Sequence, residues 1–250
     1  LLHSHISQAF SPHGMATEST GLVSGAKAEQ PLGKLATMAL ISGANSGYTI
    51  HIVSFVLVRL RREIEGISDL TYGIIGSAVY AGLLVGCPLG GTICSRWGRR
   101  LATLVGELTI LLACIIGGLI APLVMHMPSM FVACLVAWRL VVGIGTGICV
   151  TVKPIYIAEL APNSHRGKLL ALMGVANALS IMASHAVDVI ADGGEGTATG
   201  WWRAEILFNM ALPVLLLLLL LHMPESPAFV GTPAPAATTA AGAADSVEAP

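Results

Sequence analysis

The sequence predicts an all-α, polytopic membrane protein with six transmembrane helices. Hydrophobic residues make up 54% of the chain and charged residues only 11%, whereas a soluble domain usually carries about 25% charged residues. The apolar residues gather in runs of about 20, which is the length that a helix needs to cross the hydrocarbon of a bilayer. Because backbone polar groups must be bonded within each segment in lipid, we expect every run to be a helix.

The six predicted spans differ in how clearly the sequence marks them. The sixth contains an unbroken run of leucines and is the clearest, whereas Asn177, His185 and several serines and glycines weaken the fifth. In chain order, the spans cover residues 35–58, 70–94, 101–124, 129–152, 167–190 and 203–223.

The segments outside the spans divide the chain into three parts. Residues 1–34 are polar and contain glycine and serine, so we expect a disordered cytoplasmic tail. Residues 35–230 hold the six-helix bundle. Residues 231–250 form a low-complexity tail of alanine, proline and threonine, which we also expect to be disordered.

The basic residues between the spans predict which side faces the cytoplasm. With both termini inside, the inner loops carry more lysine and arginine than the outer loops, as the positive-inside rule requires. The cluster of Arg59, Arg61 and Arg62 then lies outside and argues against this orientation. We expect an integral, multi-pass protein whose first partner is the lipid bilayer, and no signal in the sequence separates plasma membrane from organelle membrane.

The sequence gives no support to several other function classes. A net charge of −1 offers no basic surface for a nucleic acid. The chain has no phosphate-binding loop, nucleophile elbow, zinc-ligand spacing or paired catalytic carboxylates, so we expect no enzyme, no cofactor and no metal site. The five cysteines all fall in apolar stretches, and we interpret them as small apolar side chains.

Arg139 places a charge inside the fourth predicted span. Such a charge costs about 2.5–3.5 kcal/mol at the bilayer centre on insertion scales, so it usually marks a transport pathway or a functional pair. Gly143, Gly145 and Gly147 follow at every second position. Because this spacing does not lie on one helix face, we expect the three glycines to contact several neighbouring helices.

Charges of both signs gather at the predicted cytoplasmic ends of the second, fourth and sixth spans. We expect those after the fourth span to lie in a polar loop. Such a set can hold helix ends together in one conformation and release them in another. Because an isolated surface pair contributes only about 0–1 kcal/mol, only a network can bias such a switch. The candidate gate residues are Arg96, Gly98, Arg99, Arg100, Glu159, Arg166 and Glu225.

Several ordered motifs resemble those of the sugar porter branch of the major facilitator superfamily. Residues 91–100, GTICSRWGRR, resemble its loop signature GxxxDRxGRR, and residues 139–147 resemble its fourth-span signature. Residues 154–167, PIYIAELAPNSHRG, resemble the segment that follows. GWWR at 200–203 and PESP at 224–227 resemble the entry and exit of the sixth span. The chain is therefore similar to the N-terminal six-helix half of such a transporter.

This resemblance implies transport of a hexose-like sugar or a polyol by alternating access. The substrate would bind between this bundle and a second six-helix bundle, supplied by a missing C-terminal half or by another chain. The positions that match the family's substrate cavity are Thr49, Arg139, Gly174 and Asn177.

Four departures from the family pattern qualify this interpretation. Thr49 stands where proton-coupled members carry an acid, so we expect facilitative movement. A pair between Arg139 and Glu107, an acid inside the third span, stays open. Gly174 stands where the family carries a glutamine that bonds sugar hydroxyls, and Asn177, one turn later, is a candidate replacement.

The gate motifs have also lost an acid and an arginine, which the chain replaces with Ser95 and Ala228. These losses leave an alternative open, in which the chain is a degenerate half-transporter that carries nothing and acts as a membrane sensor or scaffold.

Overall fold

The computed structural model describes residues 30–63, 68–192 and 201–230, and over these ranges it consists of helices joined by short turns. The long helices are α1 (Leu32–Glu63), α2 (Asp69–Trp97), α3 (Arg99–Ile115), α5 (Pro128–Leu160) and α6 (Arg166–Asp192). A π-helical turn, η1 (Ile116–Ile120), continues α3 into α4 (Ala121–Leu123). The last described helices are α7 (Trp201–Phe208), α8 (Ala211–Leu221) and the short α9 (Pro227–Val230).

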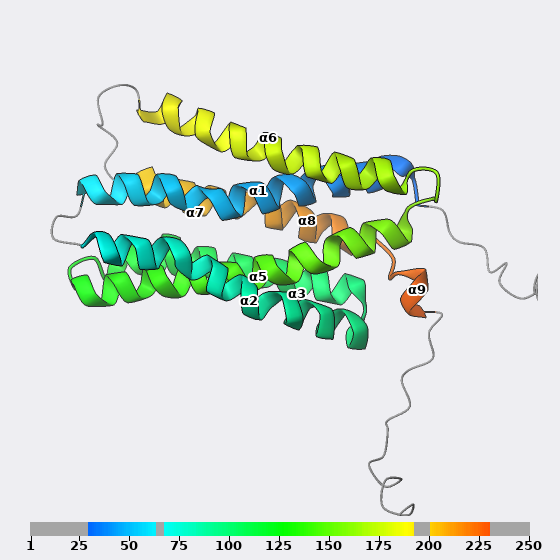
Figure 1. The fold of residues 1–250 in the computed structure, drawn as a ribbon, viewed down its shortest axis with the longest axis horizontal. Helices are drawn as coiled ribbons and strands as arrows, with labels where there is room; N and C mark the ends of the chain where they lie inside the picture. Colours follow the sequence, from blue (N-terminus) through cyan, green and yellow to red (C-terminus); the bar gives the residue numbers. More distant parts are fainter. Residues whose placement is uncertain (1–29, 64–67, 193–200, 231–250) are drawn as a thin grey trace, which may run out of the picture.

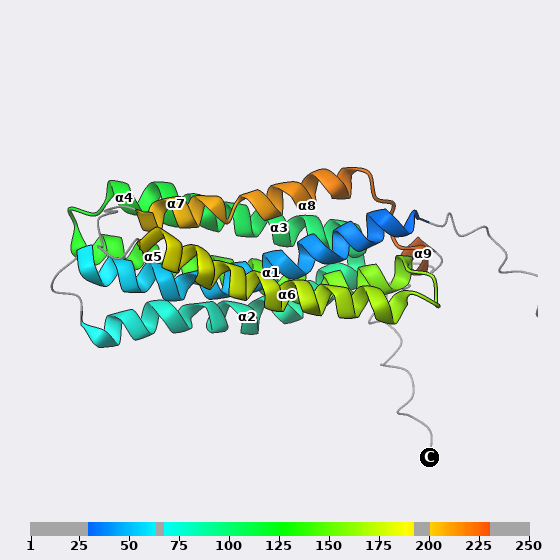
Figure 2. The same cartoon turned by 90° about the horizontal axis from the view of Figure 1, so that it is seen from above.

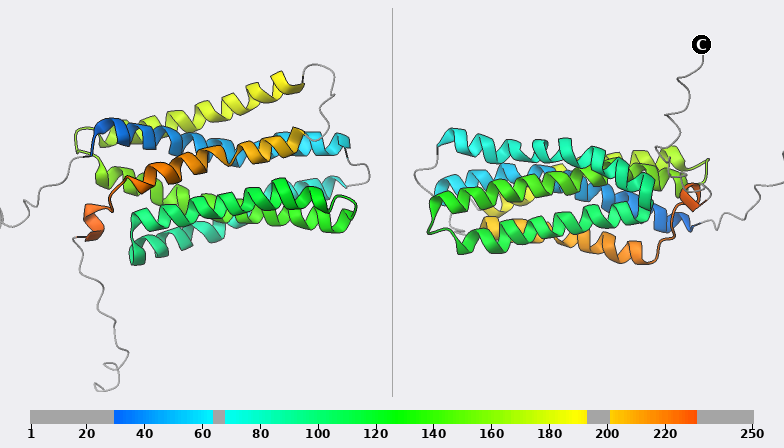
Figure 3. Two further views of the ribbon diagram at one scale, coloured as in Figure 1. Left: turned by 180° about the vertical axis from the view of Figure 1, so that it is seen from behind. Right: turned by 90° about the horizontal axis from the view of Figure 1, so that it is seen from below.

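The helices form one elongated bundle in which pairs of helices lie side by side (Figure 1). α1 packs against α6, and α5 packs against both α2 and α3. Seen from above, α2 lies along one side of the bundle, with α3, α7 and α8 along the other (Figure 2). The start of α1 and the last described helix, α9, lie at the same end of the bundle (Figure 3).

Five helical stretches of the described residues are long and apolar enough to cross a membrane. They match the first five predicted spans, although α1 begins three residues before its predicted start. α5 also continues well past residue 152. The predicted disordered tails are residues 1–34 and 231–250; residues 1–29 and 231–250 lie outside the described ranges, and residues 32–34 belong to α1. The five stretches are Leu32–Val58, Asp69–Trp97, Arg99–Leu123, Pro128–Leu160 and Arg166–Ala186.

The sixth predicted span, residues 203–223, is helical but interrupted, since α7 and α8 stand in place of one continuous helix. α7 and α8 meet at a turn formed by Asn209 and Met210. Pro213 explains the break, because proline has no N–H to donate to the carbonyl of Asn209, four residues earlier, and its ring collides with that carbonyl. The longer apolar stretch here, Glu205–Leu221, falls below the length of the other five.

Glycines bring α5 close to two neighbours, as predicted from their spacing. A Cβ on Gly143 would lie 2.2 Å from the carbonyl oxygen of Val79 on α2, and one on Gly147 would lie 2.9 Å from Gly86 on the same helix. Gly145 faces α3 instead, where a Cβ would lie 2.8 Å from Ile110. The three glycines therefore let two different helices approach the α5 backbone, which is how small residues permit tight packing in membranes.

Two apolar clusters occupy the two halves of the bundle, and a polar layer separates them on α1. One cluster includes Ile52, Val56 and Leu60 of α1, and the other includes Leu35 and Met38 of the same helix. Between them, α1 buries three polar side chains, those of Ser42, Asn45 and Thr49. Because burying a polar group without a hydrogen bond is unfavourable, these side chains need hydrogen-bond partners within the bundle.

Candidate functional site

An ion pair joins the start of α3 to the end of α5. Nε and Nη2 of Arg99 donate to the two carboxylate oxygens of Glu159 at 2.9 and 3.0 Å. Two parallel N–H···O bonds give this pair its strength and its fixed orientation. Glu159 belongs to the last turn of α5, which ends at Leu160. The prediction that Glu159 lies in a polar loop was therefore wrong.

The carboxylate of Glu225 closes the N-terminus of α3. Its Oε1 accepts hydrogen bonds from the backbone N–H groups of Arg99 at 2.9 Å, Arg100 at 3.1 Å and Ser226 at 2.9 Å. The first N–H groups of a helix have no partner within the helix, and the helix dipole favours negative charge there. Glu225 therefore binds α3 through backbone atoms rather than through an arginine side chain.

Gly98 lets Glu225 reach this position. Its φ of 93° and ψ of 168° fall in a region that is essentially restricted to glycine. A Cβ at Gly98 would also lie 2.7 Å from Oε2 of Glu225. The glycine is thus required by its backbone conformation and by the space that the carboxylate occupies.

Two further contacts complete this group. The hydroxyl of Ser226 donates to the same Glu159 carboxylate that Arg99 binds. The guanidinium of Arg100 donates to the carbonyl oxygens of Leu220 at 3.1 Å and Leu221 at 3.4 Å, at the end of α8. We call Arg99, Arg100, Glu159, Glu225 and Ser226 the end cluster, and it ties the start of α3 to the ends of α5 and α8.

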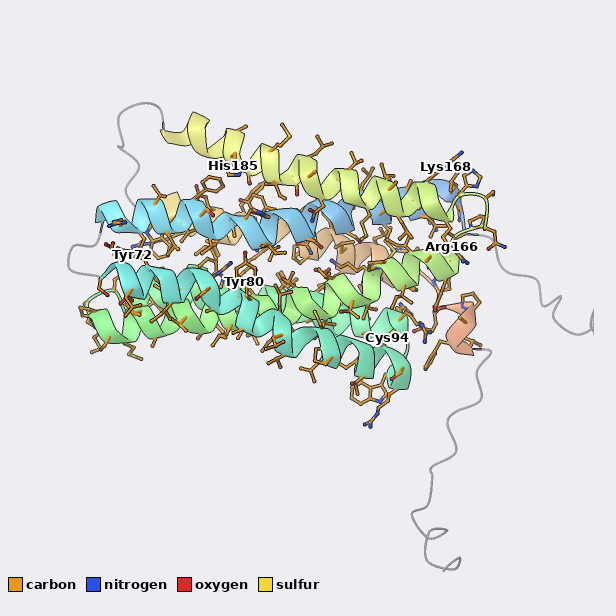
Figure 4. All side chains as sticks on the ribbon, in the orientation of Figure 1. Tyr72, Tyr80, Cys94, Arg166, Lys168 and His185 are labelled. Carbon is orange, nitrogen blue, oxygen red and sulfur yellow. The ribbon has the colours of Figure 1, made fainter. Side chains whose placement is uncertain are left out.

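The end cluster includes five of the seven predicted gate positions when Gly98 is counted, and excludes two. Arg166 is exposed and donates from Nε to the carbonyl of Ala158 at 2.8 Å, so it covers the end of α5 without touching a carboxylate. Arg96 is exposed and makes no hydrogen bond or ion pair within the described ranges. Figure 4 shows Arg166 at the same end of the bundle as Cys94, near the end of α2.

A second charged group lies deep inside the bundle. Nζ of Lys153 on α5 lies 2.5 Å from Oε1 of Glu107 on α3, and both side chains are essentially unexposed. Nδ2 of Asn45 on α1 donates to the same carboxylate at 2.9 and 3.3 Å, and the thiol of Cys149 lies 3.4 Å from it. Glu107 therefore pairs with Lys153, and the open suggestion of a pair with Arg139 was wrong.

Thr49 connects the buried group of Lys153, Glu107 and Asn45 to the turn between α7 and α8. Its hydroxyl lies 3.1 Å from Oδ1 of Asn45 and 2.9 Å from Oδ1 of Asn209, which stands between α7 and α8. Asn209 in turn lies 3.5 Å from the sulfur of Cys114. A continuous series of buried polar side chains thus joins α5, α3, α1 and the α7–α8 turn.

Arg139 is also fully buried, but it has few partners. Its Nη2 donates to the carbonyl of Ile50 on α1 at 3.4 Å, the upper limit of a hydrogen bond. Its guanidinium carbon lies 5.3 Å from the centre of the Trp138 ring. Nε and Nη1 make no hydrogen bond within the part of the chain that the structure describes.

The two remaining candidate cavity residues lie on α6. Gly174 is exposed, and a Cβ there would meet nothing within 4 Å. Asn177 is half-buried, and its backbone carbonyl lies 2.4 Å from the position of a Cβ on Gly47, where α1 and α6 approach closely. Among the described residues, no hydrogen bond joins any two of Thr49, Arg139, Gly174 and Asn177, and their place in a substrate cavity stays a prediction.

Comparison with known proteins relates this helical bundle to transporters. The family described as "Sugar (and other) transporter" matches residues 11–241. The putative metabolite transport protein YwtG of Bacillus subtilis is 32% identical over 77% of this chain, and probable inositol transporter 3 of Arabidopsis thaliana is 28% identical over 78%. The match covers 39% and 32% of those two proteins, so the chain spans well under half the length of these relatives.

Solved structures resemble the fold over about half of their own length. The inward open xylose transporter XylE from E. coli superposes with a TM-score of 0.71 over 81% of this chain and 50% of XylE, at 22% identity. A D-xylose-proton symporter superposes with a TM-score of 0.67 at 25% identity, over 81% of this chain and 51% of its own. The helical bundle thus has the fold of the N-terminal half of a major facilitator sugar porter. The chain belongs to the sugar (and other) transporter family.

Proposed function

We propose that this chain forms one half of a transporter that moves a hexose-like sugar or a polyol across a membrane by alternating access. The end cluster is the observation that carries this proposal, because it joins the ends of three helices through two carboxylates and two arginines. A network that depends on a few charge-assisted bonds can form in one conformation and break in another. The names of the relatives, which include an inositol transporter and a glucose transporter, support the substrate class.

A second six-helix bundle is the partner that alternating access requires. One exposed stripe of α2 consists mostly of small or polar residues, and α6 carries a stripe of glycine and alanine. Glycines on these stripes have open space around them, unlike the glycines inside the bundle. Because small residues permit close helix approach, the two stripes are suited to a second bundle. The residues are Gly73, Ser77, Tyr80, Leu84, Pro88, Gly91 and Ser95 on α2, and Gly167, Ala171, Gly174 and Ala178 on α6.

In this proposal the end cluster is a cytoplasmic gate. The positive-inside rule favours placing it on the cytoplasmic side, since the exposed Arg166 and Lys168 lie at the same end of the bundle (Figure 4). While the cluster is intact it holds α3, α5 and the end of α8 together, and the second bundle can close against them. When it breaks, the helix ends separate and the substrate leaves toward the cytoplasm.

Facilitative movement follows from the absence of a free acid at the first span. Thr49 cannot release a proton at physiological pH, and the acid nearest to it in the polar series, Glu107, is held by Lys153 and Asn45. Asn177 and Gly174 on α6 stay candidate substrate contacts, because Gly174 lies on the stripe proposed to face the second bundle.

Uptake by the full-length protein tests the proposal. Purified protein in proteoliposomes should take up radiolabelled glucose or myo-inositol with saturable kinetics, and an imposed proton gradient should not change the initial rate. Uptake that depends on the gradient would replace the facilitative mode with coupled transport. Uptake equal to that of empty liposomes for both compounds would reject transport of this substrate class.

One observation favours the second candidate, a non-transporting sensor or scaffold. The hydroxyl of Ser95, which stands at the acid position of the loop motif, bonds to the carbonyl of Thr92 on its own helix at 3.0 Å and adds nothing to the end cluster. Fewer bonds in the end cluster stabilise the closed state of the gate less. Absence of uptake together with normal folding and membrane insertion is the result that this alternative predicts.

A further inference from the structure

Arg139 is a buried cation that the bundle does not neutralise. Its side chain is 0% exposed, in the first half of α5, yet it makes a single long hydrogen bond to the carbonyl of Ile50. Lys153, the other fully buried cation among the described residues, lies 2.5 Å from a carboxylate of Glu107. Because a buried charge without a counter-charge is strongly unfavourable, the contrast between the two cations requires an explanation.

The described residues supply no anion to Arg139. No carboxylate within the described ranges forms an ion pair with it. The carboxylate of Glu107 is occupied by Lys153 and Asn45. Thr49, at the position where the family resemblance implies an acid in proton-coupled members, is neutral, and its hydroxyl lies within hydrogen-bond distance of two asparagine side chains.

The guanidinium retains the capacity to bind a ligand. Arginine carries five N–H donors in a planar fork that matches a carboxylate or a spherical anion. Nε and Nη1 of Arg139 are buried and make no hydrogen bond within the described part of the chain. The face of the Trp138 ring, 5.3 Å from the guanidinium carbon, attracts a cation but does not accept its N–H groups as a carboxylate would.

We propose that Arg139 is an anion-binding residue, which pairs with a singly charged anion that is either the carboxylate of a sugar acid or a chloride ion. The counter-charge that a first-span acid would supply then comes from the ligand. In the carboxylate case the inference rests on the proposed transport function and narrows its substrate to acidic sugars. In the chloride case the anion is a resident ion, and the transported sugar stays neutral.

Ligand-dependent stabilisation of the purified full-length protein tests this assignment. The melting temperature, Tm, is measured while sodium chloride, sodium glucuronate or glucose is titrated into the wild type, Arg139→Gln and Arg61→Gln. A ligand that binds only the folded state raises Tm in a saturable way. Arg61 is the matched control, because it is an exposed arginine that pairs with Asp69 outside the bundle interior.

The wild type and Arg61→Gln should show a saturable rise in Tm with at least one anion, and Arg139→Gln should lose it. A rise with glucuronate alone assigns the site to a carboxylate, and a rise with chloride assigns it to a small anion. Equal shifts in all three proteins would overturn the proposal.

Direct binding keeps the test decisive if Arg139→Gln does not fold. Equilibrium dialysis of the wild type against radiolabelled chloride and glucuronate should give one bound anion per chain, and no binding of either would overturn the proposal. Glucose uptake by proteoliposomes of the same protein separates the two conclusions. Uptake without anion binding rejects the anion site alone, whereas anion binding without uptake of glucose or glucuronate rejects transport alone.

Discussion

Glu225 binds two backbone N–H groups at the start of α3, and this contact depends on the glycine beside it. A negative charge at a helix N-terminus contributes about 0.3–1 kcal/mol, and up to about 2 kcal/mol where it is partly buried. Glu225 lies 125 residues after Arg100 in the sequence, so it caps the N-terminus of α3 from a distant part of the chain. It therefore couples the stability of one helix end to the position of another.

Gly98→Ala should destabilise the protein because alanine is strained at this φ and ψ and its methyl group collides with Glu225. The backbone strain alone costs about 1–3 kcal/mol. The measurement is the Tm of the purified protein. Gly33→Ala is the control, since a Cβ there meets nothing within 4 Å. An equal Tm for both variants would show that the close approach of Glu225 to Gly98 does not matter.

Lys153→Met should be strongly destabilising, because it leaves the carboxylate of Glu107 buried without its cation. Breaking a buried pair from one side costs about 3–5 kcal/mol, whereas replacing both members with apolar residues is often neutral. The double variant Glu107→Leu with Lys153→Met should therefore recover much of the lost Tm. If the double variant is as unstable as the sum of both single variants, the two residues do not act as a pair.

The motifs near residues 98–100 and 159 made the Arg99–Glu159 contact predictable, but the inner pair was missed. The fourth predicted span ends at residue 152, so Lys153 falls just outside it. α5 continues to Leu160 instead, which places Lys153 two turns inside the helix. The signal that was available is Glu107, an acid within an apolar span that requires a cation near it.

The length of α5 determines where its charged residues lie. Its 33 residues reach about 50 Å at 1.5 Å per residue, compared with about 30 Å for the hydrocarbon core. The helix therefore extends beyond the lipid interior, and Glu159 in its last turn can meet Arg99 near the surface. The fourth-span prediction stopped at residue 152 because it was matched to the membrane thickness, which does not limit the length of a helix.

Single methyl groups on α5 and α2 should distinguish close from ordinary helix contacts. Gly143→Ala places a Cβ 2.2 Å from the carbonyl oxygen of Val79, whereas Gly76→Ala places one 3.5 Å from Leu57, an ordinary contact distance. Overpacking typically costs about 1–3 kcal/mol. Gly143→Ala should lower Tm and Gly76→Ala should not. A Tm for Gly143→Ala that matches the wild type would mean that α2 and α5 can move apart without cost.

The break between α7 and α8 shows where sequence patterns mislead. The leucine run made the sixth span the clearest of all, yet leucine content carries no information on continuity. Pro213 was the available signal, and it was outweighed by hydrophobicity. Asn209 in the buried turn accepts a hydrogen bond from the hydroxyl of Thr49 on α1. The pattern of an uninterrupted helix does not predict this contact.

At the scale of the whole molecule, α6 presents two different exposed stripes. Gly174 belongs to the stripe of small residues, whereas Val175, 55% exposed, belongs to an apolar stripe with Leu179 and Met182 that is suited to lipid. The chain superposes on half of XylE. Family resemblance predicts a second bundle, and in our proposal the stripe of small residues is the surface that faces it.

Gly174→Trp should abolish sugar uptake by the full-length protein in proteoliposomes, because the indole would occupy the surface proposed for the second bundle and the substrate. Val175→Trp, one residue away on the lipid stripe, should retain uptake close to that of the wild type. Equal uptake by the two variants, with equal amounts of folded protein, would contradict the proposed assignment of the two stripes.

The accessibility of Ser77 from the cytoplasmic side tests the gate itself. Ser77 is exposed on the small-residue stripe of α2, toward the end of the bundle opposite the end cluster. In a full-length protein without its native cysteines, Ser77→Cys is labelled with a membrane-impermeant maleimide from the cytoplasmic side. Arg99→Ala should raise the labelling rate, since it breaks the ion pair with Glu159.

Arg166→Ala, which removes an arginine that touches no carboxylate, should leave the rate unchanged. Equal labelling rates with and without Arg99 would contradict a gate formed by the end cluster.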